Sequence, residues 1–112
     1  MSAITTHVLD IGRGRPARGV PVTLERVGTP QSMPLSRATT DADGRVKTFT
    51  PTPAIQPGTY RLTFEVGAYF ASTASEAFYQ RIVIEFEVRD AAEHYHVPVL
   101  LSPYGYSTYR GS

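Results

Sequence analysis

Three histidines are the side chains in this 112-residue sequence that are best suited to move protons near neutral pH. His7 lies in ITTHVLD, and His94 and His96 lie in HYHVPVLLS. Successive side chains of an extended strand point to opposite faces of a sheet. If Val8 and Val97 face a hydrophobic core, the histidines must face away from it. We therefore predict that they lie on outer sheet surfaces.

Apolar side chains accompany the histidines on this predicted outer face. Leu9 shares the face of His7, and Pro98 and Leu100 share the face of His96. In a monomer these apolar side chains would be exposed to solvent, so a second subunit is expected to cover this face. A histidine in a covered, largely apolar cleft can have its pKa tuned for proton transfer. The alternative is that both histidines are exposed strand residues with no chemical role.

Arg45 is a candidate for holding negative charge. It follows DADG, which signals a tight turn, and it begins a predicted strand. If the turn aims its guanidinium toward the histidine face, it could hold a carbonyl or an anionic ring oxygen by charge-assisted hydrogen bonds. If not, it is an ordinary solvated surface charge. The sequence leaves the direction of this side chain open.

Other catalytic chemistries fit the sequence less well. The HYH segment could supply two metal ligands, but a third would have to be His7, and no carboxylate lies at a familiar spacing. Glu85 and Glu87, considered as paired catalytic carboxylates, resemble solvated charges on a strand. The chain has no cysteine, no GxSxG segment and no glycine-rich phosphate loop. We therefore predict histidine-activated water, with no metal and no cofactor.

Length and composition indicate one domain covering 1–112. Hydrophobic residues make up 41% and charged residues 19% of the chain, as is typical of globular proteins. A net charge of +1 argues against nucleic acid, and no stretch approaches the roughly 20 apolar residues of a membrane span. The N-terminal segment lacks the features of a secretory signal. We expect no nucleic-acid or membrane partner and a cytoplasmic location; a periplasmic one would require that a signal had been removed.

Apolar and polar residues alternate with period two along most of the chain, as in strands with one buried face. The clearest cases are VPVTLER, TYRLTFEV and RIVIEFEV. We predict about eight strands, near 4–10, 20–27, 35–41, 45–49, 59–66, 81–88, 94–102 and 104–110. One short helix is predicted near 72–78, where Ser72 or Thr73 could cap it. The pattern predicts an all-β, two-sheet antiparallel β-sandwich.

Five segments resemble the 5-hydroxyisourate hydrolases, the transthyretin-related enzymes of purine (urate) degradation. They are HVLD at 7–10, GRPA at 14–17, TTDADGR at 39–45, GAYF at 67–70 and HYHVPVLLSPYGYSTYRGS at 94–112. The middle of the chain is also similar to prealbumin-like sandwich modules in general, so it supports a transthyretin-like fold more than a function. Transthyretin has lysine and threonine at the positions of His7 and His96 and does not end in YRGS. These differences favour an enzyme.

The resemblance implies a reaction and an assembly. Enzymes of this family are cyclic amide hydrolases that open 5-hydroxyisourate to 2-oxo-4-hydroxy-4-carboxy-5-ureidoimidazoline. They form homotetramers, as dimers of dimers, with active sites in the channel where two dimers meet. Two other functions stay open: a non-enzymatic, transthyretin-like carrier of a small ligand, and a structural sandwich module of a surface protein.

The resemblance also implies which residues act. The family's catalytic histidines and arginine map onto His7, His96 and Arg45, whereas His94 does not map onto a catalytic position. The implied substrate-binding residues are Arg45, Tyr109, Arg110, Gly111 and Ser112. We expect the histidine pair to activate water and Arg45 to orient the substrate and stabilise negative charge. Which histidine is the general base stays open.

The C-terminal tail has an expected path. The segment YGYSTY should pair with HYHVPVLL through the SPYG turn, which holds the terminus near His96. Tyr109 would then pack at a subunit face, and Arg110 would fix the tail by its charge. Gly111 would let the chain bend so that Ser112 reaches the site. The sequence does not distinguish the hydroxyl of Ser112 from its terminal carboxylate as the acting group.

Overall fold

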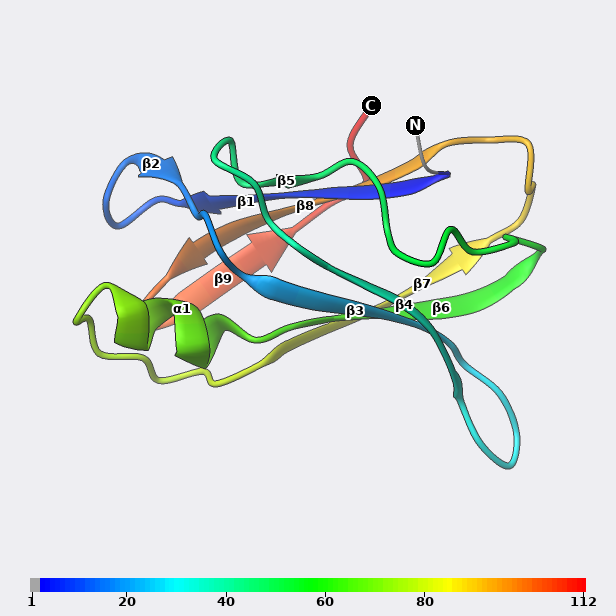
Figure 1. Cartoon of the computed structure of the whole chain (residues 1–112), viewed down its shortest axis with the longest axis horizontal. Coiled ribbons are helices and arrows are strands. Elements are labelled where there is room, and N and C mark those ends of the chain that lie inside the picture. The colour runs from blue at the N-terminus through cyan, green and yellow to red at the C-terminus, as the bar shows by residue number, and fades with distance from the viewer. Residues whose placement is uncertain (1–2) are drawn as a thin grey trace.

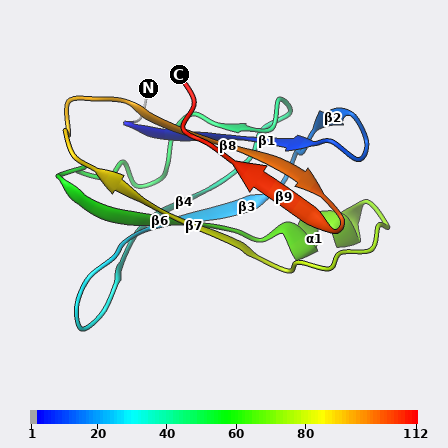
Figure 2. The same ribbon diagram turned by 180° about the vertical axis from the view of Figure 1, so that it is seen from behind.

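Within residues 3–112, which the computed structural model describes, the chain forms two packed β-sheets and one short helix (Figure 1). One sheet contains β1 (Ile4–Asp10), β2 (Arg15–Pro16), β5 (Arg45–Val46), β8 (Tyr95–Ser102) and β9 (Gly105–Thr108). The other contains β3 (Pro21–Arg26), β4 (Met33–Thr39), β6 (Gly58–Phe64) and β7 (Ile82–Val88). The helix lies at one end of the sandwich (Figure 2). The predicted all-β, two-sheet fold is confirmed.

The alternating segments bury the faces that the sequence predicts. Side chains that point between the two sheets are fully buried, and each such Leu, Val or Phe contributes about 1.5–3 kcal/mol through its removal from water. They include Val22, Leu24, Leu62 and Phe64 of the second sheet and Ile4, Val8, Val99 and Leu101 of the first. In β7, which is an edge strand, Ile84 and Phe86 are only half-buried. An edge strand has neighbours on one side only, so its inward face is less completely covered.

The helix lies earlier in the chain than predicted. α1 spans Val66–Ser72 and not 72–78. Its buried residues are Val66, Tyr69 and Phe70, whose i, i+3, i+4 spacing is that of a helix face packed on a core. The prediction relied on a capping side chain, but α1 follows Glu65 without a side-chain cap, and Thr73 lies at its other end. No helix among the described residues is long and apolar enough to cross a membrane.

Strand pairing in the first sheet decides which residues become neighbours. β8 lies between β1 and β9, and β5 pairs with β1. β1 and β8 are parallel, with Thr5 opposite His96 and His7 opposite Pro98, which departs from the antiparallel pairing predicted throughout. Six strands, β2 to β7, lie between β1 and β8 in the chain, so no hairpin forces these two strands to be antiparallel. β5 is antiparallel to β1, with Arg45 opposite His7.

Candidate active site

Three neighbouring strands bring the predicted catalytic side chains to one face of the first sheet. His7 on β1 stands opposite Arg45 on β5, and Thr5 on β1 stands opposite His96 on β8. Residues opposite one another on paired strands share a face, as do residues i and i+2 of one strand. Thr5, His7, Arg45 and His96 therefore share a face, although they come from three distant parts of the chain.

The turn before β5 holds Arg45 against β1. The carboxylate of Asp41 accepts hydrogen bonds from the backbone amides of Arg45 (3.0 Å) and Asp43 (2.9 Å), and these bonds lower its pKa. Gly44 has a φ of 74°, and a Cβ at this position would clash with the carbonyl oxygen of Val8. That close approach lets the Val8 amide donate a 2.7 Å hydrogen bond to the Gly44 carbonyl. The DADGR segment thus needs its glycine, and it places Arg45 on the histidine face.

His7 is half-buried, and the same turn decides which of its ring nitrogens carries the proton. Its Nε2 lies 2.8 Å from the backbone carbonyl oxygen of Asp43. A carbonyl oxygen only accepts, so Nε2 carries the proton and Nδ1 holds the lone pair when the ring is neutral. Burial lowers the pKa of His7, and the charge of Arg45 lowers it further. The ring is therefore neutral near pH 7 and available to accept a proton.

His96 is also half-buried and held in a neutral form. Burial is the main cause that lowers its pKa, and the charges of Arg45, His7 and His94 add to the effect. Its Nδ1 lies 2.7 Å from the hydroxyl oxygen of Thr5. Nε2, on the other side of the ring, is then the nitrogen available for chemistry. A neutral imidazole is the form that a general base requires.

A pocket of about 380 Å³ lies over this part of the sheet. Its lining includes Thr5, Arg45, Lys47, His94, His96 and Ser112. His7 does not line it in the single chain, because its ring is engaged with the turn at Asp43. Thr5 and Lys47 were missed by the sequence reasoning; each lies two residues from a predicted site residue on an alternating strand, which was the available signal. Among residues 3–112, no three His, Cys, Asp or Glu side chains gather so that they could hold a metal ion.

The C-terminal tail continues past β9 and covers the ring of His96. The amide of Gly111 donates a 2.8 Å hydrogen bond to the carbonyl oxygen of His96. A Cβ on Gly111 would lie 2.7 Å from Cδ2 of His96 and 3.0 Å from Cγ of Pro98, closer than real side chains approach. Pro98 is buried as a result, so the chain covers part of this face with its own tail. The glycine is needed for this close contact, whereas the sequence predicted that it serves a bend.

Arg110 anchors the tail beside the pocket. Its guanidinium lies 4.5 Å from the ring centroid of Tyr95 and 3.2 Å from the carboxylate of Glu93. The predicted electrostatic anchor is therefore present. Tyr109 is 58% exposed and, with Arg110, lines a smaller hollow of about 180 Å³ between β7 and the first residues of β8. Of the four tail residues, Ser112 alone lines the pocket that contains Arg45 and His96.

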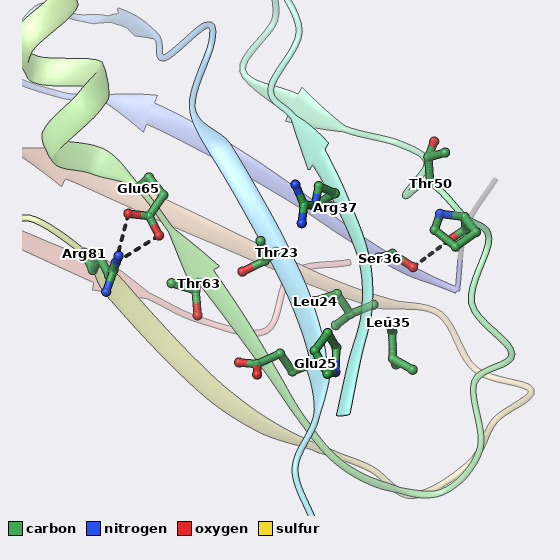
Figure 3. Close-up of a pocket in the computed structure, with 12 residues that line it drawn as sticks. Thr23, Leu24, Glu25, Leu35, Ser36, Arg37, Thr50, Thr63, Glu65 and Arg81 are labelled. Atoms are coloured by element: carbon green, nitrogen blue, oxygen red, sulfur yellow. Dashed lines mark hydrogen bonds and ion pairs between the residues drawn. The ribbon is translucent and has the colours of Figure 1, made fainter. Parts of the chain in front are cut away.

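A wider hollow of about 640 Å³ lies over the outer face of β3, β4 and β6 in the second sheet (Figure 3). Its charged side chains include Glu65 and Arg81, which form an ion pair of 2.9 Å, and the hydroxyl of Ser36 donates to the Pro51 carbonyl. No histidine is among the residues that line it. This hollow lacks a group that could exchange protons near neutral pH, so the histidine pocket is the better candidate site.

We expect Arg45→Gln to raise the pKa of both His7 and His96, because the guanidinium charge lowers both in the native protein. In the native protein the lowered pKa keeps each imidazole neutral down to a lower pH. In the variant, both imidazoles should therefore become protonated at a higher pH than in the native protein. NMR titration of the histidine ring protons measures this directly. Arg37→Gln, which removes an exposed charge from β4 in the other sheet, is the matched control and should shift neither titration. Unchanged titrations in Arg45→Gln would mean that Arg45 does not face the histidines.

Comparisons with known proteins agree with this fold. A family model described as the HIUase/Transthyretin family matches residues 4–111. The chain is 47% identical to the 5-hydroxyisourate hydrolase of Salmonella dublin over 109 residues, which cover 97% of this chain and 80% of the relative. The solved structure of Klebsiella pneumoniae 5-hydroxyisourate hydrolase is similar with a TM-score of 0.84 and 43% identity, covering 97% of this chain and 98% of that one. Sea bream transthyretin in complex with thyroxine superposes with a TM-score of 0.90 but 24% identity, covering 97% and 94% of the two chains, and shows the fold alone.

Proposed function

This chain belongs to the HIUase/transthyretin family, and we propose that it hydrolyses 5-hydroxyisourate to 2-oxo-4-hydroxy-4-carboxy-5-ureidoimidazoline. The observation that carries the proposal is the meeting of His7, Arg45 and His96 on one sheet face, beside a pocket that Ser112 also lines. Two imidazoles held neutral next to a guanidinium suit the hydrolysis of a cyclic amide.

The proposed reaction assigns one role to each group. Nε2 of His96 takes a proton from water while the water oxygen bonds to the ring carbonyl carbon, and Arg45 stabilises the oxyanion that forms. The oxyanion then reforms the carbonyl, the ring C–N bond breaks, and the proton passes from the imidazolium to the leaving nitrogen. The single product is the opened ring with a carboxylic acid, which loses its proton to solvent to become a carboxylate. One water is consumed. His7 is assigned to proton transfer beside Arg45, and the Ser112 terminus to contact with the substrate.

Arg45→Lys is expected to lower kcat/KM by about tenfold or more, because an ammonium group cannot reproduce the planar fork of a guanidinium. The charge is conserved, so the pKa values of the two histidines should change less than in Arg45→Gln. Initial rates of ultraviolet decay of freshly generated 5-hydroxyisourate measure the effect. Full activity in Arg45→Lys would demote Arg45 to a surface charge.

We also propose that the protein is a homotetramer, a dimer of dimers, with its sites in the channel between dimers. β7 and β9 are edge strands of the two sheets, and each leaves one side free for pairing within the described chain. Exposed aromatic residues lie along these edges, including Tyr79 and Tyr106, whose ring centroids are 5.3 Å apart. Light scattering on the purified protein tests the assembly; a stable monomer would contradict it and would favour a structural module.

The proposed reaction is tested by comparing catalysed with spontaneous decay of 5-hydroxyisourate. The substrate also decays without enzyme, so the protein must accelerate the loss of absorbance and yield an optically active product. A transthyretin-like carrier would instead bind a small ligand tightly and form no product. Decay at the spontaneous rate with a racemic product would reject the hydrolase proposal.

A further inference from the structure

The hydroxyl of Thr5 lies between two imidazole rings. Its oxygen is 2.7 Å from Nδ1 of His96 and 2.9 Å from Nε2 of His94. Thr5 is 5% exposed, whereas His94 is exposed and His96 half-buried, so the contact connects a half-buried ring with a more solvated one. The two histidines come from alternate positions of one segment, and their ring centroids are 6.3 Å apart. Neither Thr5 nor His94 has a role in the reaction proposed above.

A hydroxyl group has one proton, so the two short contacts cannot both be donated by Thr5. In one arrangement Thr5 donates to Nδ1 of His96 and accepts from Nε2–H of His94. A neutral His96 then carries its proton on Nε2, where it cannot act as a base. In the other arrangement Nδ1–H of His96 donates to Thr5, and Thr5 donates to Nε2 of His94. Only this second arrangement leaves a lone pair on Nε2 of His96.

We propose that Thr5 and His94 are positioning residues for His96: His94 accepts the Thr5 proton, and Thr5 thereby keeps the proton of His96 on Nδ1. This inference rests on the proposed function, in which Nε2 of His96 takes a proton from water. His94 is the acceptor that makes the productive arrangement available. Without it, the Thr5 hydroxyl is free to donate to Nδ1 and to remove the base from the pocket.

The same chain of hydrogen bonds has a second consequence after water is deprotonated. The new proton is on Nε2 of His96, and the Nδ1 proton can pass to the oxygen of Thr5 while the Thr5 proton passes to Nε2 of His94. His96 and Thr5 have then each gained one proton and lost one, so both are neutral. His94 has gained a proton and lost none, so it becomes the imidazolium. The positive charge is then on the more exposed ring of His94. The return of the protons along the same path supplies the leaving nitrogen.

The charged groups around His96 disfavour a positive charge on its own ring. Arg45 of β5 and Lys47, which follows that strand, line the same pocket. Arg45 and His7 are among the charges that lower the pKa of His96. Ser112 lines the pocket from the tail. On the other side, the guanidinium of Arg110 lies 3.3 Å from the backbone carbonyl oxygen of His94 and pairs with Glu93. The tail therefore also holds the segment that carries His94.

Nitrogen NMR of the full-length protein, labelled with ¹⁵N at histidine, tests the inference independently of activity. We expect His96 to be protonated on Nδ1 at neutral pH in the native protein and in Thr5→Ser, which keeps the hydroxyl. Thr5→Val and His94→Phe should move the proton wholly or partly to Nε2. The matched control is Thr6→Val, because the Thr6 hydroxyl donates to the Val97 carbonyl and not to a histidine; it should leave the His96 spectrum unchanged.

The kinetic effect should appear in kcat. Thr5→Val and His94→Phe are each expected to lower kcat about tenfold with KM within about twofold, and Thr5→Ser should restore most of the rate. An Nε2–H form of His96 in the native protein, or an Nδ1–H form that survives in both variants, would overturn the inference. If the spectra change as expected but the native protein shows no hydrolysis, the coupling stands and the proposed function fails.

Discussion

His96→Ala and His7→Ala should each lower the rate of 5-hydroxyisourate hydrolysis by at least about tenfold, and loss of a well-placed acid–base group can reach about 100- to 10,000-fold. Both rings are half-buried side chains at the surface of a sheet, and neither belongs to the core between the sheets. The fold and the assembly should therefore survive. Ultraviolet decay of freshly generated substrate gives the rate, while circular dichroism and light scattering report fold and oligomer.

Thr23→Ala is the control for this pair of variants. It trims a side chain in the hollow on the outer face of the other sheet (Figure 3), whose lining contains no histidine. We expect it to retain native activity, which would also separate that hollow from the chemistry. Near-native rates in both histidine variants would show that the histidine mechanism is wrong, whatever the family membership of the chain.

Removal of residues 109–112 should abolish most of the activity while leaving the chain folded. β9 ends at Thr108, so the β8–β9 ladder stays complete in the shortened chain. The deletion removes the Gly111 amide that binds the His96 carbonyl and the Ser112 terminus that lines the pocket. Thermal unfolding should change by a few degrees at most, whereas kcat/KM should fall at least about tenfold. A fully active shortened chain would show that the tail has no part in the reaction.

Gly111→Ala makes the same test with a single methyl group. The added Cβ would meet the His96 ring at 2.7 Å, so either the ring or the tail must move. Gly105→Ala is the matched control in the same segment, because the nearest atom to its Cβ would be 3.7 Å away. We expect activity to be lost in the first and kept in the second. Ser112→Ala then separates the two chemical groups of the terminus, since it removes the hydroxyl and keeps the carboxylate.

Alternation in the sequence was sufficient to predict the two sheets and their buried faces. Val22, Leu24, Leu62 and Phe64 are buried as predicted, because a period of two leaves only one way to put four apolar side chains on one side of a strand. The helix lies earlier than predicted because its position depends on the buried face of Val66, Tyr69 and Phe70, with i, i+3, i+4 spacing, and not on a capping side chain. The sequence predicted the DADG turn, but it did not predict whether this turn places Arg45 on the face of the histidines. The pairing of β5 with β1 decides that.

The sequence by itself determined the face on which each histidine lies and the chemistry that an imidazole can perform there. Only the tertiary structure decided which groups meet those rings. Thr5 reaches His94 and His96 across 89 and 91 residues of chain, and it does so because β1 and β8 pair in parallel with one particular register. The close approach of Gly111 to His96, which leaves no room for a Cβ, likewise depends on where the tail crosses β8. Periodicity fixes the direction of a side chain within its own strand, but strand partners and register depend on how both sheets close over a common core.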